Sequence, residues 1–164
     1  MKVKEVRFEK LFSLEGYNNE RIGFTVELSE AEDEGKVVAE LFFKICQIEE
    51  CLSAYRRLLR TYQNVLEEHR YAQLDEQRAR KEAEELKAEL EKTSDELEHV
   101  QKAIKLRRLA DELKTREERL AMLEGELSRL ERAREELKRR IKSGEFTLEG
   151  LGIPADELRK MEVA

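Results

Sequence analysis

The sequence is poor in the residues that build a thick globular core. Its 164 residues include one proline, two cysteines and no tryptophan, and aromatic side chains make up 6%. This composition is typical of long helices that pack against each other. There is no apolar run of about eighteen residues and no basic, apolar leader, so the sequence predicts neither a membrane span nor a signal peptide. We therefore expect a cytoplasmic protein with no membrane contact.

The sequence also lacks the short motifs that carry catalysis or ligand binding. It contains no GxxxxGK[ST] or GxGxxG loop, no HExxH and no GxSxG. Cys46 and Cys51 would lie about 140° apart around a helix, so they cannot bridge to each other there and are expected to be buried and reduced. His69 and His99 have no companions at metal-ligand spacing. We expect a protein that is not an enzyme and that holds no metal or cofactor.

What the sequence does contain is a long heptad pattern. From Ile48 to Ile104 a first apolar stripe recurs at alternating steps of three and four, which keeps one helix face toward a partner helix. Its predicted seam residues are Tyr55, Leu58, Tyr62, Val65, Leu86, Leu90, Leu97 and Val100. A second stripe runs from Leu106 to Ile141, with predicted seam residues Leu120, Leu123, Leu127, Leu130 and Leu137. The slip of one residue between the stripes rotates the apolar face by about 100°, so one straight helix cannot present both stripes to one partner.

A chain reversal near residues 92–94 would resolve this slip. Thr93 and Glu96 form a capping box, which is a helix-start signal, and acidic residues follow where the helix dipole favours them. An antiparallel hairpin would pair residue i with about 187 − i, so that Leu97 meets Leu90 and Val100 meets Leu86. No glycine or proline enforces a break, so the alternative is one continuous long helix in a parallel coiled-coil dimer.

The N-terminal residues have the alternation of a β-hairpin. One predicted strand places Val6, Phe8, Lys10, Phe12 and Leu14 on one face, and a second alternates through Ile22, Phe24, Val26 and Leu28. Residues 15–20 have turn chemistry. A capping box at Ser29 and Glu32 then predicts a helix start near residue 30.

Residues 5–50 resemble small uncharacterised proteins found in phages, archaea and bacteria. The resemblance is carried by several short sequence segments and by the acidic patch and helix that follow them. The segments are Phe8-Glu9-Lys10, Leu14, Tyr17-Asn18-Asn19-Glu20-Arg21-Ile22-Gly23 and Val26-Glu27-Leu28. It implies a compact strand-strand-helix head in a mobile-element setting, and it implies no activity.

The C-terminal residues predict a short folded tail. Ser143-Gly144 ends the second long helix, and a last short helix runs from Pro154 to Met161. Residues 145–149 alternate like a strand and could supply a third strand to the head. The tail could instead be a partner-binding peptide that is disordered until bound. The predicted parts are thus a head with the start of the first helix (1–50), a coiled-coil stalk (51–142) and a tail (143–164).

One charge feature suggests binding. In two segments of the predicted hairpin, basic residues outnumber the acidic residues near them. We call these basic residues the basic belt: Arg56, Arg57, Arg60, Arg132, Lys138, Arg139 and Arg140. Such a belt could track nucleic-acid phosphates. The other interpretation is a solvated face whose arginines pair with glutamates three or four residues away, and the net charge of −6 favours it.

The predicted fold is mostly α, a small β head on a long antiparallel helical hairpin, and it favours a non-catalytic scaffold or adaptor. Each helix of a two-helix layer buries only one stripe, so self-association, first as a dimer, would cover what remains. Such a protein would present its small head and could come from a virus or mobile element. The alternatives are a nucleic-acid-associated accessory protein and a prefoldin-like holdase, although the strands of prefoldin lie between its helices and these precede both.

Overall fold

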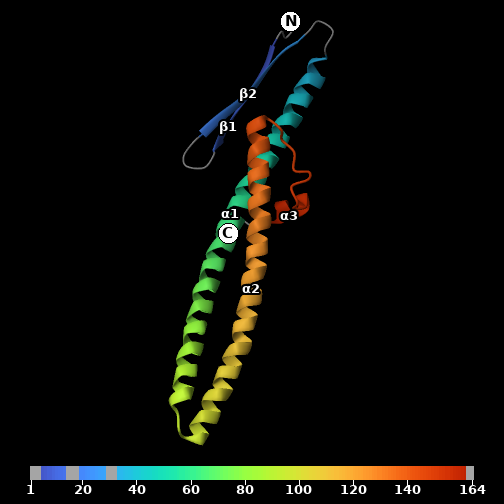
Figure 1. Cartoon of the computed structure of the whole chain (residues 1–164). Coiled ribbons are helices and arrows are strands. Elements are labelled where there is room, and N and C mark those ends of the chain that lie inside the picture. Colours follow the sequence, from blue (N-terminus) through green and yellow to red (C-terminus); the bar gives the residue numbers. More distant parts are fainter. Residues whose placement is uncertain (1–4, 14–18, 29–32, 162–164) are drawn as a thin grey trace. The chain divides into compact units, whose positions relative to one another are not determined.

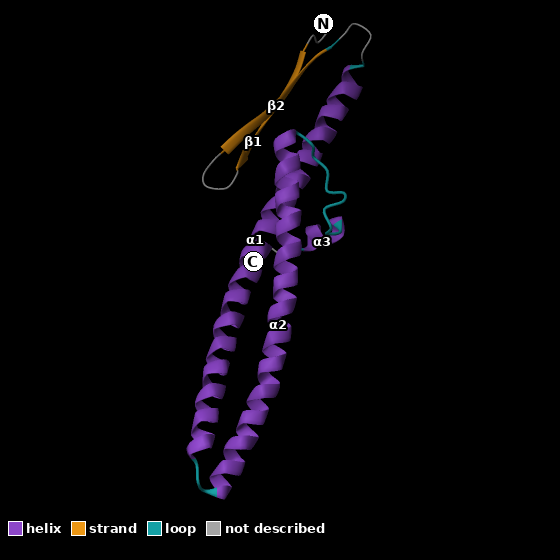
Figure 2. Cartoon of the chain, viewed as in Figure 1, coloured by secondary structure: helices purple, strands orange, loops and turns teal. Residues whose placement is uncertain are grey.

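The computed structural model describes residues 5–13, 19–28 and 33–161. Two strands, β1 (Glu5–Ser13) and β2 (Asn19–Glu27), precede three helices, α1 (Glu34–Lys92), α2 (Glu96–Ser143) and α3 (Ala155–Lys160), as Figure 1 and Figure 2 show. The chain divides into two compact units, residues 1–53 and 54–164, and α1 belongs to both. The predicted fold class, mostly α with a small β-hairpin and an antiparallel helical hairpin, is confirmed. The alternative of one continuous helix is wrong.

The β-hairpin in the first unit has the predicted pairing of apolar faces. Val6 lies opposite Val26 and Phe8 opposite Phe24 in an antiparallel register. Directly opposed residues share a face, so the two apolar rows fall on the same side of the sheet. Among the side chains described, Val6 and Val26 are half-buried while Glu5, Arg7, Thr25 and Glu27 are exposed. The predicted turn, residues 15–20, lies mostly outside the described residues.

Helix α1 begins later than the sequence predicts. Its first residue is Glu34, and the Asp33 carboxylate accepts a hydrogen bond of 2.9 Å from the Gly35 backbone N–H. The Asp33 carbonyl also accepts from the backbone N–H groups of Lys36 and Val37. Asp33 therefore caps the helix, whereas the predicted capping box at Ser29 and Glu32 lies outside the described residues. Over its 59 residues the helix is about 90 Å long.

The chain reverses at residues 93–95, one residue beyond the predicted turn. The Asp95 carboxylate, and not the Thr93 hydroxyl, caps α2 by accepting from the backbone N–H groups of Leu97 and Glu98 at 2.8 and 3.3 Å. The Thr93 hydroxyl instead donates to the Glu89 carbonyl at the end of α1. A carboxylate at the positive N-terminal end of α2 is the stronger cap, which explains the exchange of roles.

Helices α1 and α2 of the second unit pack along one seam. Leu58, Leu130 and Leu137 are completely buried, and Val65, Leu86 and Leu123 are nearly so. Nearer the turn, Ala79, Ala83, Leu86 and Leu109 form a core cluster flanked by Leu106 and Leu113. The other predicted seam residues of this stretch, Tyr55, Tyr62, Leu90, Leu120 and Leu127, are partly buried.

Leu97 and Val100 lie outside this seam. Their exposed fractions are 72% and 56%, so the predicted contacts of Leu97 with Leu90 and of Val100 with Leu86 are wrong. Helix α2 instead follows the second stripe back toward the turn, through Leu109 and Leu106 to Lys102, whose side chain is largely covered. The first stripe therefore contributes to the seam only in α1. After the chain reverses, a different face of α2, the one that carries the second stripe, packs against α1.

The tail folds back and is not a strand. Gly144 has φ 79°, the left-handed conformation of a helix-ending glycine, which agrees with the predicted end of α2. Residues 145–149 form a loop, and the sheet of the described residues has two strands, so the third strand expected there is wrong. The short helix expected from Pro154 is α3, and Leu151, Ile153 and Leu158 are buried. The described tail residues are folded, which corrects the expectation of a tail disordered until bound.

Truncation of Leu130 tests the seam. We expect Leu130→Ala to lower the free energy of unfolding by roughly 2–5 kcal/mol, because the side chain is fully buried and its loss leaves a cavity. Met122→Ala, about two turns away on the same helix, should change it by less than about 0.5 kcal/mol because Met122 is 76% exposed. Urea unfolding followed by circular dichroism measures both, and equal losses in the two variants would contradict the seam.

Candidate functional site

The two long helices are joined by a row of ion pairs across the seam. Helix α1 carries an acid every seventh residue, at Glu68, Asp75, Glu82 and Glu89. Each pairs with a base of α2: Glu68 with Arg119 at 2.6 Å, Asp75 with Arg116 at 3.2 Å, Glu82 with Lys105 at 3.0 Å and Glu89 with Lys102 at 3.4 Å. Sequence reasoning missed this row, although its seven-residue spacing matches the positions that flank a coiled-coil seam. These ion pairs join α1 to α2 of the same chain.

Some of the side-chain contacts match the predicted pairing of residue i with about 187 − i, and others are displaced from it. Lys105 reaches Glu82 as that pairing requires. The Arg134 guanidinium lies 4.6 Å from the centre of the Tyr62 ring, whereas the pairing places residue 125 opposite Tyr62. Helical side chains lean toward the N-terminus of their own helix, and in antiparallel helices these leans run in opposite directions. The displacement of the Tyr62–Arg134 contact is in the direction of these leans.

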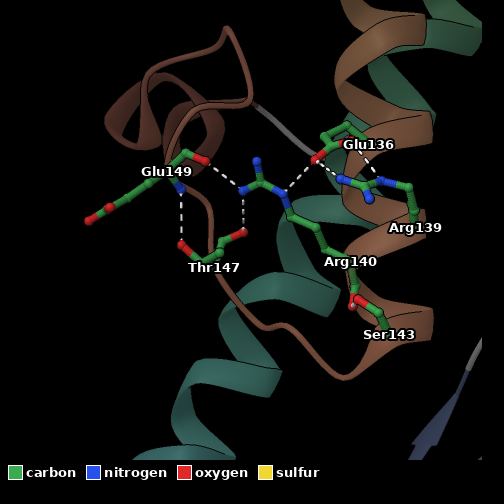
Figure 3. Close-up of polar contacts among 6 residues, drawn as sticks. All are labelled: Glu136, Arg139, Arg140, Ser143, Thr147 and Glu149. Atoms are coloured by element: carbon green, nitrogen blue, oxygen red, sulfur yellow. Dashed lines mark hydrogen bonds and ion pairs between the residues drawn. The ribbon is translucent and has the colours of Figure 1, made fainter.

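Arg140, expected in the basic belt, holds the tail against α2. Its guanidinium donates to the Thr147 carbonyl at 3.3 Å and to the Glu149 carbonyl at 2.5 Å, and its Nε donates to the Glu136 carboxylate at 2.8 Å (Figure 3). The Arg140 side chain is largely buried, with 13% exposed. An arginine that donates to two loop carbonyls and one carboxylate fixes the loop and is not available for an external phosphate.

Two further arginines connect α3 to the long helices. Arg57 of α1 donates to the Arg159 carbonyl at 2.8 Å, and Arg129 of α2 pairs with Glu157 at 3.1 Å. Leu158, between these contacts in the sequence, is completely buried. Helix α3 is therefore held by both α1 and α2 within the second unit, through polar contacts at its edges and an apolar anchor.

The rest of the predicted belt makes contacts within its own helix or is exposed. Arg139 donates to Glu136 at 2.8 and 3.0 Å, and Lys138 lies 3.9 Å from Glu135. Arg132 donates to the Ser128 carbonyl of its own helix. Arg56 and Arg60 are exposed. The belt is thus no continuous row of open cations, and its two most engaged members, Arg57 and Arg140, are bound to the tail.

The clearest unsatisfied surface is an apolar stripe beside the turn. We call Leu97, Val100 and Ile104 the tip stripe; their exposed fractions are 72%, 56% and 51%. Their spacing of three and four places them on one face of α2. The same helix uses Lys102, Leu106 and Leu109 toward α1, so the tip stripe faces away from the seam. Exposed apolar side chains gathered on one face are typical of an interaction surface.

The described residues show no concave, buried site. The hollows on them are shallow; one is lined by side chains of α1 together with Arg119, including Tyr71 and Asp75, and another by one face of α1 around Phe43. In the described part of the chain no group of three or more histidine, cysteine or acidic side chains could hold a metal ion, and no helix is long and apolar enough to cross a membrane. Neither cysteine is in a disulfide; Cys51 is buried, but Cys46 is exposed, which corrects the expectation that both are buried.

These elements define an antiparallel helical-hairpin coiled coil whose tail is folded onto the stalk, with a β-hairpin in a separate unit. No protein-family model matches the chain, and neither a curated protein nor a solved structure shows significant similarity to it.

Loss of the Arg140 side chain tests its hold on the tail. We expect Arg140→Gln to speed hydrogen exchange of the backbone amides of residues 145–160 several-fold, because the loop loses the donors that bind Thr147 and Glu149. Arg139→Gln is the matched control, since Arg139 binds the same Glu136 and its hydrogen bonds go to that carboxylate. Equal exchange in both variants would contradict the assignment.

The pKa of Glu136 tests the same cluster. Hydrogen bonds from Arg139 and then Arg140 lower the pKa of Glu136 from 4.5 to about 2. A carboxyl whose pKa is lowered in the folded state stabilises the fold above its unfolded pKa, and this contribution is lost as the pH falls from about 4.5 toward 2. Titration of the Glu136 carboxyl carbon by NMR should give a midpoint near 2, and Arg139→Gln should raise it. A midpoint near 4.5 in the wild type would contradict these hydrogen bonds.

Proposed function

We propose that this protein is a non-catalytic coiled-coil scaffold or adaptor that associates with copies of itself and presents a small β-hairpin head. The observation that carries the proposal is that the helical hairpin buries one stripe on each helix and leaves other large apolar side chains outside. In the second unit these exposed residues are Tyr71, Leu74, Leu97, Val100, Ile104 and Met122. A surface that retains apolar side chains after the chain has folded favours association.

The rigidity of the stalk supports a spacer role. The four acid–base pairs of the row described above cross the seam between α1 and α2, and the tail is bound at the opposite end of α2 from the turn. Isolated exposed ion pairs contribute little, about 0–1 kcal/mol each, but a regular row opposes alternative alignments of the two helices. A helical hairpin of fixed alignment holds its two ends at a fixed distance, as a scaffold requires.

The other two candidate functions have less support. A nucleic-acid surface needs cations that are open to phosphates, and Arg57 and Arg140 are bound to tail carbonyls while Arg139 is paired with Glu136. A holdase similar to prefoldin has less support because both strands precede the two long helices here, whereas the strands of prefoldin lie between its helices. A cytoplasmic location belongs to the scaffold proposal and is supported by the two thiols outside any disulfide, which a reducing compartment maintains.

Sedimentation velocity over a range of concentrations tests the proposal. We expect the average mass of the chain to rise from that of a monomer toward at least that of a dimer as the concentration increases to several hundred micromolar, a range in which weak interfaces associate. High salt should leave most of the association in place because apolar contacts drive it. A chain that remains a monomer throughout would contradict self-association.

A further inference from the structure

The tip stripe lies between two clusters of opposite charge. Glu96 precedes Leu97 at the first residue of α2, and Arg107 and Arg108 follow Ile104 within one turn. All three charged side chains are exposed, and within the described ranges none of them forms an ion pair. The apolar stripe is thus acidic at its beginning and basic at its end.

The lysines in this segment are used differently. Lys102 binds Glu98 at 2.9 Å and Glu89 at 3.4 Å and donates to the Thr93 hydroxyl, and Lys105 pairs with Glu82. These contacts are internal to the helical hairpin and fix the turn. Glu96, Arg107 and Arg108 are exposed beside the tip stripe. The charges next to the stripe therefore belong to the surface that faces away from α1.

From this pattern we infer that the tip stripe is a self-complementary docking surface, on which the tip stripe of a second copy of this chain lies antiparallel about a two-fold axis. The inference rests on the proposed self-association and assigns the surface that makes it. Leu97 of each copy would meet Ile104 of the other, and the two Val100 side chains would meet at the axis. A two-fold interface of this kind uses the same patch on both copies and closes at the dimer.

The charges select the antiparallel orientation. When Leu97 lies opposite Ile104 of the second copy, Glu96 lies within one turn of Arg107 and Arg108 of that copy, and the two-fold axis repeats this pair of contacts. A parallel arrangement would instead place glutamate beside glutamate and arginine beside arginine, which is unfavourable. The same pattern disfavours a uniformly basic or uniformly acidic partner, since either would meet like charge at one end of the stripe.

The surface is small, which sets the strength of the dimer. Three apolar side chains from each copy bury less than the roughly 800 Å² per partner of a standard stable interface. We therefore expect a weak dimer, with a dissociation constant on the order of 100 µM. Such a dimer forms where the chain is locally concentrated and dissociates on dilution.

A charged residue in the stripe provides the first test. Val100→Glu should weaken dimerisation at least tenfold, because it buries two carboxylates against each other at the axis. Met122→Glu is the matched control: Met122 is as exposed as Leu97 on the same helix but is not in the tip stripe, so its dissociation constant should stay within twofold of the wild type. Sedimentation equilibrium measures all three proteins, and circular dichroism checks that each remains helical.

The outcomes separate this inference from the proposed function. A wild-type chain that dimerises while Val100→Glu dimerises equally well overturns the tip assignment and leaves self-association standing. Equal loss in Met122→Glu and Val100→Glu overturns the assignment as well. A wild-type chain that remains a monomer contradicts both, and it would leave the stripe to a partner other than this chain.

Charge-reversal variants, alone and mixed, test the orientation and the charge contacts. Glu96→Arg and the double variant Arg107→Glu, Arg108→Glu should each dimerise several-fold more weakly than the wild type, because each places like charges together. An equimolar mixture should recover dimers of one copy of each, since every contact in that mixed dimer joins opposite charges. In a parallel dimer each variant would only exchange one pair of like charges for another, so variants that dimerise as strongly as the wild type would overturn the antiparallel arrangement. Failure of the mixture to associate more strongly than either variant alone would overturn the charge contacts.

Discussion

The burial of one apolar stripe on each long helix is the constraint on which this structure depends. The chain has too few aromatic and branched residues gathered in one place for a thick core, so its apolar side chains can leave water only between helices. Leu58, Leu130 and Leu137 become completely buried in this way. Because the stripes of α1 and α2 lie on different faces, a straight helix could not bury both, and reversal at residues 93–95 satisfies them together.

Charge then determines how the helices align and how the tail is held. The acid row of α1 meets Lys102, Lys105, Arg116 and Arg119 of α2, and Arg140 and Arg57 bind backbone carbonyls of the tail. Two of the cations that suggest a nucleic-acid surface in the sequence, Arg57 and Arg140, are thereby used within the fold. The tip stripe on α2 near the turn remains exposed, with an acidic side chain at one end and basic side chains at the other. It is the surface that we propose for the association.

Much of the fold could be predicted from the sequence because heptad spacing and strand alternation report directly which side chains share a face. The two strands, both long helices, the turn and α3 were all predicted within a few residues. The errors have one physical origin, since a pattern along the chain does not show where contacts between distant segments fall. Leu97 and Val100 continue the first stripe in the sequence, but after the turn they lie outside the seam. The sequence places Arg140 in the basic belt, whereas in the structure its guanidinium binds the carbonyls of Thr147 and Glu149.

A distance between two spin labels tests the reversal of the chain most directly. The labels would be placed at Gln63 of α1 and Ser128 of α2, which are both exposed, in a chain with Cys46→Ser and Cys51→Ala, and the labelled chain would be diluted with unlabelled chain. A hairpin predicts a separation below about 30 Å, since packed helix axes lie about 10 Å apart. A continuous helix would separate the two labels by about 100 Å at 1.5 Å per residue, and that result would contradict the account.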